Sequence, residues 1–162
     1  MKSYDGFYTV RGYQLLEHEK KLLTPAMEDY LEMIYRRSLE KESLRVNEIA
    51  ELLNVQASSA TKMIQRLAVI GLIDYEKYGY ILLTARGREI GAFLLKRHAI
   101  VEQCLKNLGI RDTLLVDTEL VEHHISMGAL QNLEKLNLFF EKHPEAYRKF
   151  AEFEVEHPFH CP

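Results

Sequence analysis

The sequence has no long apolar segment and only two cysteines, and both absences narrow the class of protein. No run of about 18 apolar residues occurs, so no segment is expected to cross a membrane. The first residues lack the charged-then-apolar pattern of a secretory signal. Cys104 and Cys161 are too few and too far apart for a disulfide framework. We therefore expect a protein of the reducing cytoplasm.

Internal repeats and low-complexity stretches are also missing, and the composition is that of an ordinary globular chain. Of the 162 residues, 47% are hydrophobic and 28% are charged, which suffices for one or two small domains with a core. The net charge of −3 is unevenly distributed. Residues 45–97 carry 8 Lys and Arg against 5 Asp and Glu, whereas residues 98–162 carry 6 against 11. A basic middle section indicates contact with a polyanion there.

Helical periodicity begins after residue 23. Thr24 is a capping residue, Pro25 is tolerated in the first turn of a helix, and apolar residues follow on one face through about Lys41. The pattern of residues 1–23 assigns no role to this N-terminal extension.

A winged helix-turn-helix is predicted next. Apolar spacing indicates two short helices over residues 46–53 and 57–70, joined by a tight turn at Asn54. After Gly71 the period changes to two, which predicts a small β-hairpin wing over residues 72–83. The residues expected to face inward are Val46, Ile49, Leu52 and Leu53 in the first helix and Ala60, Met63, Ile64 and Leu67 in the second.

The remainder is predicted to be all-helical. One long helix is expected over residues 85–108, where Gly109 suits the left-handed residue that ends a helix. Further helical patterns cover residues 112–126, 128–140 and the segment from Pro144 to about residue 156. The pattern over residues 128–140 carries an apolar surface that suits a partner helix, at Leu130, Leu133, Leu136, Leu138, Phe139 and Phe140.

The chain is therefore expected to be mainly α. A DNA-binding winged-helix domain is expected over residues 24–90, and an all-α metal-binding and dimerisation domain over residues 91–156. The long helix links the two domains, and residues 157–162 form a tail.

The second helix of the helix-turn-helix has the side chains of a DNA-reading helix. Small hydroxyl residues allow close approach to a duplex, Gln and Arg can address base edges, and Lys binds phosphate. A solvated polar face is the alternative, which the adjoining hairpin and the basic segment disfavour. RNA is not expected, because neither an aromatic platform on a strand nor a Gly-x-x-Gly clamp is present. The candidates are Ser58, Ser59, Thr61, Lys62, Gln65 and Arg66, with Lys77 and Tyr78 at the hairpin turn and Arg45, Arg86 and Arg88 beside them.

Four carboxylates and two imidazoles stand at helical spacings. Asp29 and Glu32 are three residues apart, and Glu119, Glu122 and His123 follow the spacing i, i+3, i+4, so each group projects from one face of its helix. Together these two faces could hold a metal ion. With one histidine of the long helix, the candidate ligands are Asp29, Glu32, His98, Glu119, Glu122 and His123.

Each part of this set has an ordinary explanation. A Glu-His-His run such as 122–124 usually belongs to a solvated helix face, and a lone histidine such as His98 is usually exposed or satisfied locally. The combination favours a cation, since Asp29 lies beside core positions, where an uncompensated carboxylate is costly. Converging carboxylates would also repel one another without a cation.

The ligand types indicate which metal to expect. Carboxylates and imidazoles without thiolate favour a fairly hard ion such as Mn²⁺, and argue against Cu(I) or a four-cysteine zinc site. With four ionised carboxylates and neutral imidazoles the site carries −4, a charge that two divalent ions would neutralise. Our hypothesis is therefore two Mn(II) ions per chain, with Glu119 and Glu122 as bridges.

On these residues the chain resembles the manganese transport regulators of the diphtheria toxin repressor superfamily. The resemblance implies that the six candidates are the family's manganese ligands. It also implies a homodimer formed through the C-terminal helices, binding to a palindromic operator in double-stranded DNA, and repression of Mn(II) uptake genes when Mn(II) is bound. It covers residues 24 to about 140 and is carried by Pro25–Glu32, Ser58–Met63, Tyr75–Tyr78, Leu83–Gly87, Arg97–His98 and Glu119–His124.

The resemblance also bears on metal choice. Iron-responsive relatives have a methionine at the place of Asp29 and a cysteine at that of Glu119, so oxygen ligands at both places favour manganese. The tail residues His157, His160 and Cys161 match nothing in the family, and an ordinary chain terminus explains them better than a second, soft-metal site.

Two other classes of function remain open on sequence alone. A metal-dependent hydrolase would need an open coordination position and a nucleophile or base beyond the ligands, and the sequence offers none, so an enzyme is not expected. A winged-helix regulator that responds to iron or to a small organic ligand is the stronger alternative.

Overall fold

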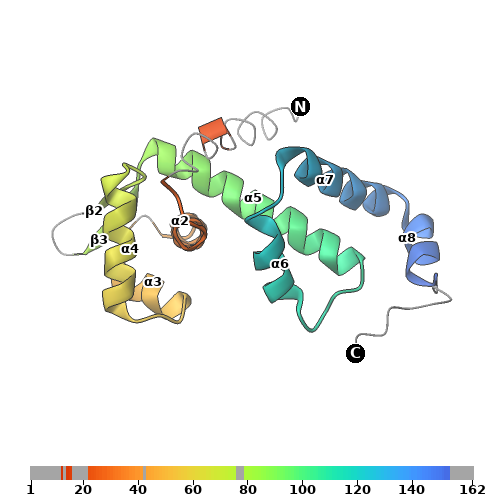
Figure 1. Cartoon of the computed structure of the whole chain (residues 1–162), viewed down its shortest axis with the longest axis horizontal. Coiled ribbons are helices and arrows are strands. Elements are labelled where there is room, and N and C mark those ends of the chain that lie inside the picture. The colour runs from red at the N-terminus through yellow and green to blue at the C-terminus, as the bar shows by residue number, and fades with distance from the viewer. Residues whose placement is uncertain (1–11, 13, 16–21, 42, 76–78, 154–162) are drawn as a thin grey trace. The chain divides into compact units, whose positions relative to one another are not determined.

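The computed structural model describes residues 12, 14–15, 22–41, 43–75 and 79–153 (Figure 1). The chain divides into two compact units, with the boundary between Arg97 and His98. Across the described part, the elements are seven α-helices, α2 to α8, and one sheet of three short strands. The expectation of a mainly α fold with a winged helix-turn-helix is therefore confirmed.

No helix among the described residues combines the length and apolar character needed to cross a bilayer.

Helix α2 spans Pro25–Ser38 and begins where the capping residue predicted it. The Thr24 hydroxyl accepts a hydrogen bond from the Met27 backbone N–H at 3.4 Å, which satisfies one free donor of the first turn. Arg36 and Arg37 lie in the last turn, where cations are favourable. The buried apolar residues of α2 are Met27, Tyr30, Leu31 and Ile34.

Helices α3 (Val46–Leu52) and α4 (Ala57–Val69) form the helix-turn-helix. Asn54 has a φ of 51° in the turn between them, a conformation that Asn tolerates better than most residues. The predicted inward face is correct at Val46, Ile49, Ala60, Ile64 and Leu67, while Met63 is only half-buried.

The inward face of α3 was predicted wrongly at its end. Leu52 is 39% exposed and Leu53 is half-buried, whereas Ala50 is buried. The helix has only seven residues, and the stripe set by Val46 continues at i+3 and i+4, which are Ile49 and Ala50. Leu52 lies on the other side of the helix.

The wing is a three-stranded antiparallel sheet in the order β1-β3-β2, rather than the hairpin alone. Strand β2 (Ile73–Tyr75) pairs with β3 (Tyr80–Leu83), and β1 (Leu44–Arg45) adds to the other edge of β3. Two residues are too few for period-two alternation to be recognisable, which explains why β1 was missed. The turn with Lys77 and Tyr78 lies outside the described residues.

Helix α5 spans Ala85–Asn107 and crosses the boundary between the units. The Thr84 hydroxyl accepts from the Gly87 N–H at 3.0 Å at its start. Gly109 has a φ of +89° at its end, where the N–H groups of Gly109 and Ile110 donate back to the carbonyls of Lys106 and Leu105. This is the Schellman arrangement, and the C-terminus of α5 lies where Gly109 predicted it.

The second unit contains the remainder of α5 and three shorter helices, α6 (Leu114–Glu122), α7 (Met127–Lys142) and α8 (Pro144–Ala151). Helix α6 ends earlier than predicted, since His123 and His124 form a turn before Ser126 caps α7. Among the described residues of the second unit, the buried apolar ones are Ile100, Val101, Cys104 and Leu130.

Candidate metal centre and DNA-reading surface

Four of the predicted ligands lie together in the second unit. Nδ1 of His98 on α5 lies 3.3 Å from Oε2 of Glu122 and 4.0 Å from Oε1 of Glu119. Nε2 of His123 lies 3.8 Å from Oε2 of Glu119. Glu119, Glu122 and His123 each offer a ligand atom within 4.8 Å of the others. The α6 spacing thus gathers oxygen and nitrogen donors around one position.

The electrostatics of this cluster favour a cation. Glu119 and Glu122 lie in the last turn of α6, where the free carbonyl groups carry partial negative charge, and no basic residue occupies that turn. Glu122 is only 1% exposed, so solvent screens its charge poorly. Positive charge supplied at this point would offset both contributions.

The donor set fits a hard divalent ion. Carboxylate and imidazole groups surround the position, and the described thiol, that of Cys104, lies in the core of this unit. Burial raises the pKa of the Cys104 thiol, which keeps it protonated and unsuited to bind metal as a thiolate. Oxygen and nitrogen donors without thiolate match Mn²⁺ better than a soft ion.

The other two predicted ligands belong to the first unit. Asp29 is half-buried on α2, and Glu32, one turn further on, is buried and accepts a hydrogen bond from Arg36 at 2.6 Å. Three residues apart on one helix, they face the same side. That Asp29 and Glu32 bind the same metal as the ligands of the second unit stays a prediction.

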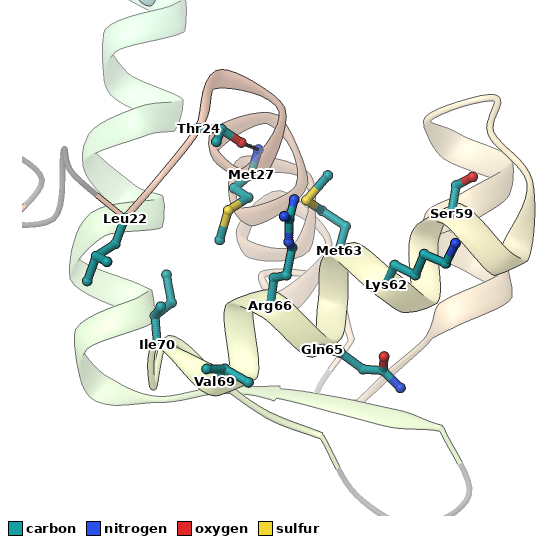
Figure 2. Close-up of a pocket in the computed structure, with 10 residues that line it drawn as sticks. All are labelled: Leu22, Thr24, Met27, Ser59, Lys62, Met63, Gln65, Arg66, Val69 and Ile70. Carbon is teal, nitrogen blue, oxygen red and sulfur yellow. Dashed lines mark hydrogen bonds between the residues drawn. The ribbon is translucent and has the colours of Figure 1, made fainter.

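The predicted DNA-reading residues lie on the outer face of α4. Figure 2 shows Ser59, Lys62, Gln65 and Arg66 projecting from this helix, and all four are exposed, as is Ser58. Thr61 differs, because it is half-buried and its hydroxyl donates to the Ala57 carbonyl at 2.8 Å. That hydroxyl is engaged by its own helix and contributes less polar surface than the sequence suggested.

A hollow of about 790 Å³ adjoins this face of α4 and extends to the start of α2 (Figure 2). Met27, Met63 and Ile70 contribute apolar surface, and the side chains of Lys62 and Arg66 project beside them. Within the described part of the chain, the lining contains no acidic residue. The charged side chains of this lining, Lys62 and Arg66, are therefore both cations, which favours contact with a polyanion.

Arg45, one of the flanking cations, is held in place by an aromatic neighbour. Its guanidinium donates to the Tyr80 hydroxyl at 2.7 Å and lies 4.8 Å from the centre of the Tyr80 ring. Tyr80 was not among the sequence candidates, because only the pairing of β1 with β3 brings it opposite Arg45. Such a held cation at the edge of the wing suits a backbone phosphate.

Two family models divide the chain between them. The N-terminal DNA binding domain of the iron dependent repressors matches residues 22–81, and the metal binding and dimerisation domain of the same repressors matches residues 84–151. The chain belongs to the iron dependent repressor family. Membership makes it a DNA-binding transcriptional regulator, with a domain for metal binding and dimerisation, and not an enzyme.

Relatives within the iron dependent repressor family are similar over most of the chain. The HTH-type transcriptional regulator MntR of Shouchella clausii is 40% identical over 137 residues, which are 84% of this chain and 96% of that protein. MntR of Listeria monocytogenes serotype 4b is 39% identical over 136 residues, covering 83% of this chain and 96% of the relative.

Two solved structures of metal-dependent regulators share the fold. The manganese regulator SloR matches with a TM-score of 0.63 at 32% identity over 72% of this chain, and the metal-dependent regulator MtsR with 0.64 at 28% over the same share. This chain spans 55% of the length of each of those two proteins.

The apolar surface available for dimerisation differs from the predicted one. Leu130 is 3% exposed and belongs to the core of its own unit, so it does not contribute to an outer face. Leu138 and Phe139 on α7 are exposed as expected. The sequence reading overlooked α6, where Leu115 and Leu120 are each 65% exposed. Large apolar side chains at such exposure are typical of a surface that another chain covers.

Proposed function

We propose that this protein is a manganese-responsive repressor that switches off Mn(II) uptake genes in the cytoplasm when the cation is abundant. DNA reading is assigned to residues 24–90, and metal binding and dimerisation to residues 91–156. The observation that carries the metal assignment is the cluster of oxygen and nitrogen donors at the end of α6. The similarity to SloR, which is named as a manganese regulator, supports the choice of metal.

The ligand set is proposed to include residues of both units. Asp29 and Glu32 on α2 would complete the donors at His98, Glu119, Glu122 and His123. Carboxylate at both ends of the site favours a harder ion than a set with thioether or thiolate would. We propose two Mn(II) ions per chain, since four carboxylates carry more negative charge than one divalent ion neutralises.

The route from metal site to DNA runs through α2. This helix contacts both α3 and α4, so a change in its position is passed to the DNA-reading helix. Bound Mn²⁺ supplies the positive charge that lets the carboxylates of α2 and α6 converge. Their convergence would fix the spacing of the two winged helices in the dimer. A coupling of about 1–3 kcal/mol corresponds to roughly 5- to 150-fold tighter operator binding.

The DNA contacts are proposed on two elements. Ser58, Ser59, Gln65 and Arg66 would address base edges and Lys62 a phosphate, since all five are exposed on α4. Thr61 is retained as a weaker candidate contact, because its hydroxyl already donates to the Ala57 carbonyl. Lys77 and Tyr78, which lie outside the described residues, complete the proposed interface, and the dimer would bind a palindromic operator in double-stranded DNA.

Operator binding with and without Mn²⁺ tests the function. Fluorescence anisotropy of a labelled palindromic duplex should show binding that tightens at least about 5-fold on adding Mn²⁺ and reverts with chelator. His123→Ala should lose the response. His124→Ala is the matched control, because His124 is the exposed neighbour in the turn after α6, with its Nδ1 3.2 Å from the carbonyl oxygen of Leu120. Equal responses in the two variants would contradict the ligand assignment.

The number of ions has its own measurement. Free Mn²⁺ is seen by electron paramagnetic resonance, so titration of the apoprotein should show signal loss up to two equivalents per chain. Saturation at one equivalent would remove the two-ion proposal and leave the function intact.

Iron remains the second candidate effector. The family description names iron, and Fe²⁺ accepts the same oxygen and nitrogen donors. Anaerobic titration with Fe²⁺ in the anisotropy assay distinguishes an iron-responsive regulator from a manganese-responsive one. If Fe²⁺ matches Mn²⁺ in both affinity and operator response, the manganese assignment is wrong.

A further inference from the structure

Two contacts attach α2 to α5 within the first unit, a buried ion pair and the packing of half-buried Tyr35 on a glycine. Arg97 donates to Oε2 of Glu28 at 2.8 Å, and the two side chains are 6% and 10% exposed. Tyr35 packs against Gly91, where a Cβ would lie only 2.6 Å from the Tyr35 Cβ. The contacts are separated by seven residues on α2 and six on α5, which is about 10 Å and about 9 Å along the two helices.

These attachments adjoin the proposed metal ligands in sequence. Asp29 follows Glu28, and Glu32 lies one turn beyond it on the same face. His98 follows Arg97, so α5 carries both attachment residues and one ligand. The axial position and rotation of α2 on α5 therefore decide where the two carboxylates point.

We propose that the Glu28–Arg97 ion pair and the Tyr35–Gly91 contact form a two-point clamp that positions Asp29 and Glu32 for metal binding. The clamp residues bind no metal themselves. The inference rests on the proposed function, because it concerns how the ligands of that site are held.

A merely stabilising role explains the arrangement less well. Buried ion pairs contribute little net stability compared with apolar groups of the same shape, whereas their hydrogen-bond geometry is directional. One contact alone would let α2 pivot about it, and a second contact two turns further along α2 restricts this rotation. Binding groups must be held within about 0.5 Å of their productive geometry, so fixing the helix matters for affinity.

Three substitutions test the clamp by different routes. Glu28→Gln and Arg97→Met each remove the ion pair with opposite changes in charge, and Gly91→Ala pushes α2 away with no change in charge. Mn²⁺ affinity is measured by electron paramagnetic resonance, and folding by urea denaturation of the apoprotein. Glu40→Gln is the matched control, because it breaks an exposed ion pair with Arg37 of 2.6 Å, also involving α2.

Positioning predicts that all three variants bind Mn²⁺ about 10- to 100-fold more weakly, as is usual when groups supporting metal ligands are lost. Glu40→Gln should bind as the wild type does. An effect of charge alone would weaken binding in Glu28→Gln and strengthen it in Arg97→Met, because removing a cation favours another cation. Opposite changes of Mn²⁺ affinity in Glu28→Gln and Arg97→Met would contradict the clamp. Variants that bind Mn²⁺ with wild-type affinity but have a lowered urea midpoint would contradict it as well.

A milder variant guards against failure to fold. Arg97→Lys keeps the charge but loses the planar fork, so it should fold and show an intermediate loss of affinity. If it bound Mn²⁺ as tightly as the wild type, directional positioning would be excluded. Absence of Mn²⁺ binding by the wild-type protein would remove the proposed function itself, whereas equal binding by wild type and variants removes only the clamp.

Discussion

The two units bury their apolar residues to very different extents. Among the described residues, 19 of the 23 buried hydrophobic side chains belong to the first unit and four to the second. The exposed large hydrophobic side chains show the reverse, with nine of 14 in the second unit. The winged helix thus completes a core from its own helices and sheet. The helical unit leaves apolar surface for another chain and gathers carboxylates for a cation.

This difference teaches how a metal-responsive regulator separates its tasks. The stability of the DNA-reading unit comes mainly from burial of its own apolar residues. The helical unit buries fewer apolar residues of its own, so we expect dimerisation and bound cations to contribute more to its stability. Variants in each unit should therefore respond differently to protein concentration and to Mn²⁺.

The largest effect is expected from Leu120→Asp on α6. Leu120 is 65% exposed, and a carboxylate in its place would be costly to bury between two chains. Loss of the dimer makes the two operator contacts independent, which lowers operator affinity by about 10²- to 10⁴-fold. Sedimentation velocity should show a monomer whose circular dichroism matches that of the wild type. A variant that remains dimeric would place the interface on another face, such as that of Leu138 and Phe139.

The next largest effect is expected from Ile64→Ala on α4, which truncates a side chain with no exposed surface. Large-to-small core substitutions of this kind cost about 2–5 kcal/mol, since they remove buried area and leave a cavity. Urea denaturation should give this loss at every protein concentration and with or without Mn²⁺. Val69→Ala is the control on the same helix, because Val69 is 86% exposed and its truncation should change stability little. A loss in Ile64→Ala that Mn²⁺ abolished would mean that the first unit is not self-contained.

Glu119→Ala should have a smaller and metal-dependent effect. At a Mn²⁺ concentration about 100 times the dissociation constant, binding stabilises the wild-type protein by about 2.7 kcal/mol, and the variant should lose most of this. Without metal the variant should be as stable as the wild type or slightly more so, because Glu119 and Glu122 no longer repel in the last turn of α6. Thermal melts with and without Mn²⁺ measure the stabilisation by metal and the stability of the apoprotein. A variant that keeps the full Mn²⁺ stabilisation would remove Glu119 from the site.

The sequence predicted the parts of the fold that depend on neighbouring residues. Thr24 with Pro25 marked the start of α2, and Gly109 marked the end of α5, because caps act within one turn. Strand β1 and the pairing of Arg45 with Tyr80 were missed, since they join segments 35 residues apart. Buried faces failed where a helix is too short for its periodicity to be read, as in α3.

The candidate site divides in the same way. Helical spacing alone aligned Glu119, Glu122 and His123, and the structure brings His98 to them. The supporting contacts, such as Gly91 against Tyr35, could not be predicted, because a glycine in a helix does not reveal which side chain lies over it. The spacing of residues along one helix predicts which side chains can share a ligand. The contacts that hold those side chains in place depend on packing between helices, which the spacing does not reveal.

The smallest effect is expected at Glu48, at the solvent edge of the first unit. Hydrogen bonds from the Lys41 side chain and from the Arg45 backbone N–H lower the pKa of its carboxyl. A depressed pKa in the folded state means that the contribution is present above the carboxyl's unfolded pKa and is lost as the pH falls through the folded value. The group is largely exposed, so solvent screening limits the contribution to less than about 1 kcal/mol. Urea midpoints of wild type and Glu48→Gln should therefore differ slightly at neutral pH and converge in acid. Because this edge belongs to the self-contained unit, the difference should be the same with and without Mn²⁺, and a difference that grew on adding the cation would show that the two units are not as separate as their cores suggest.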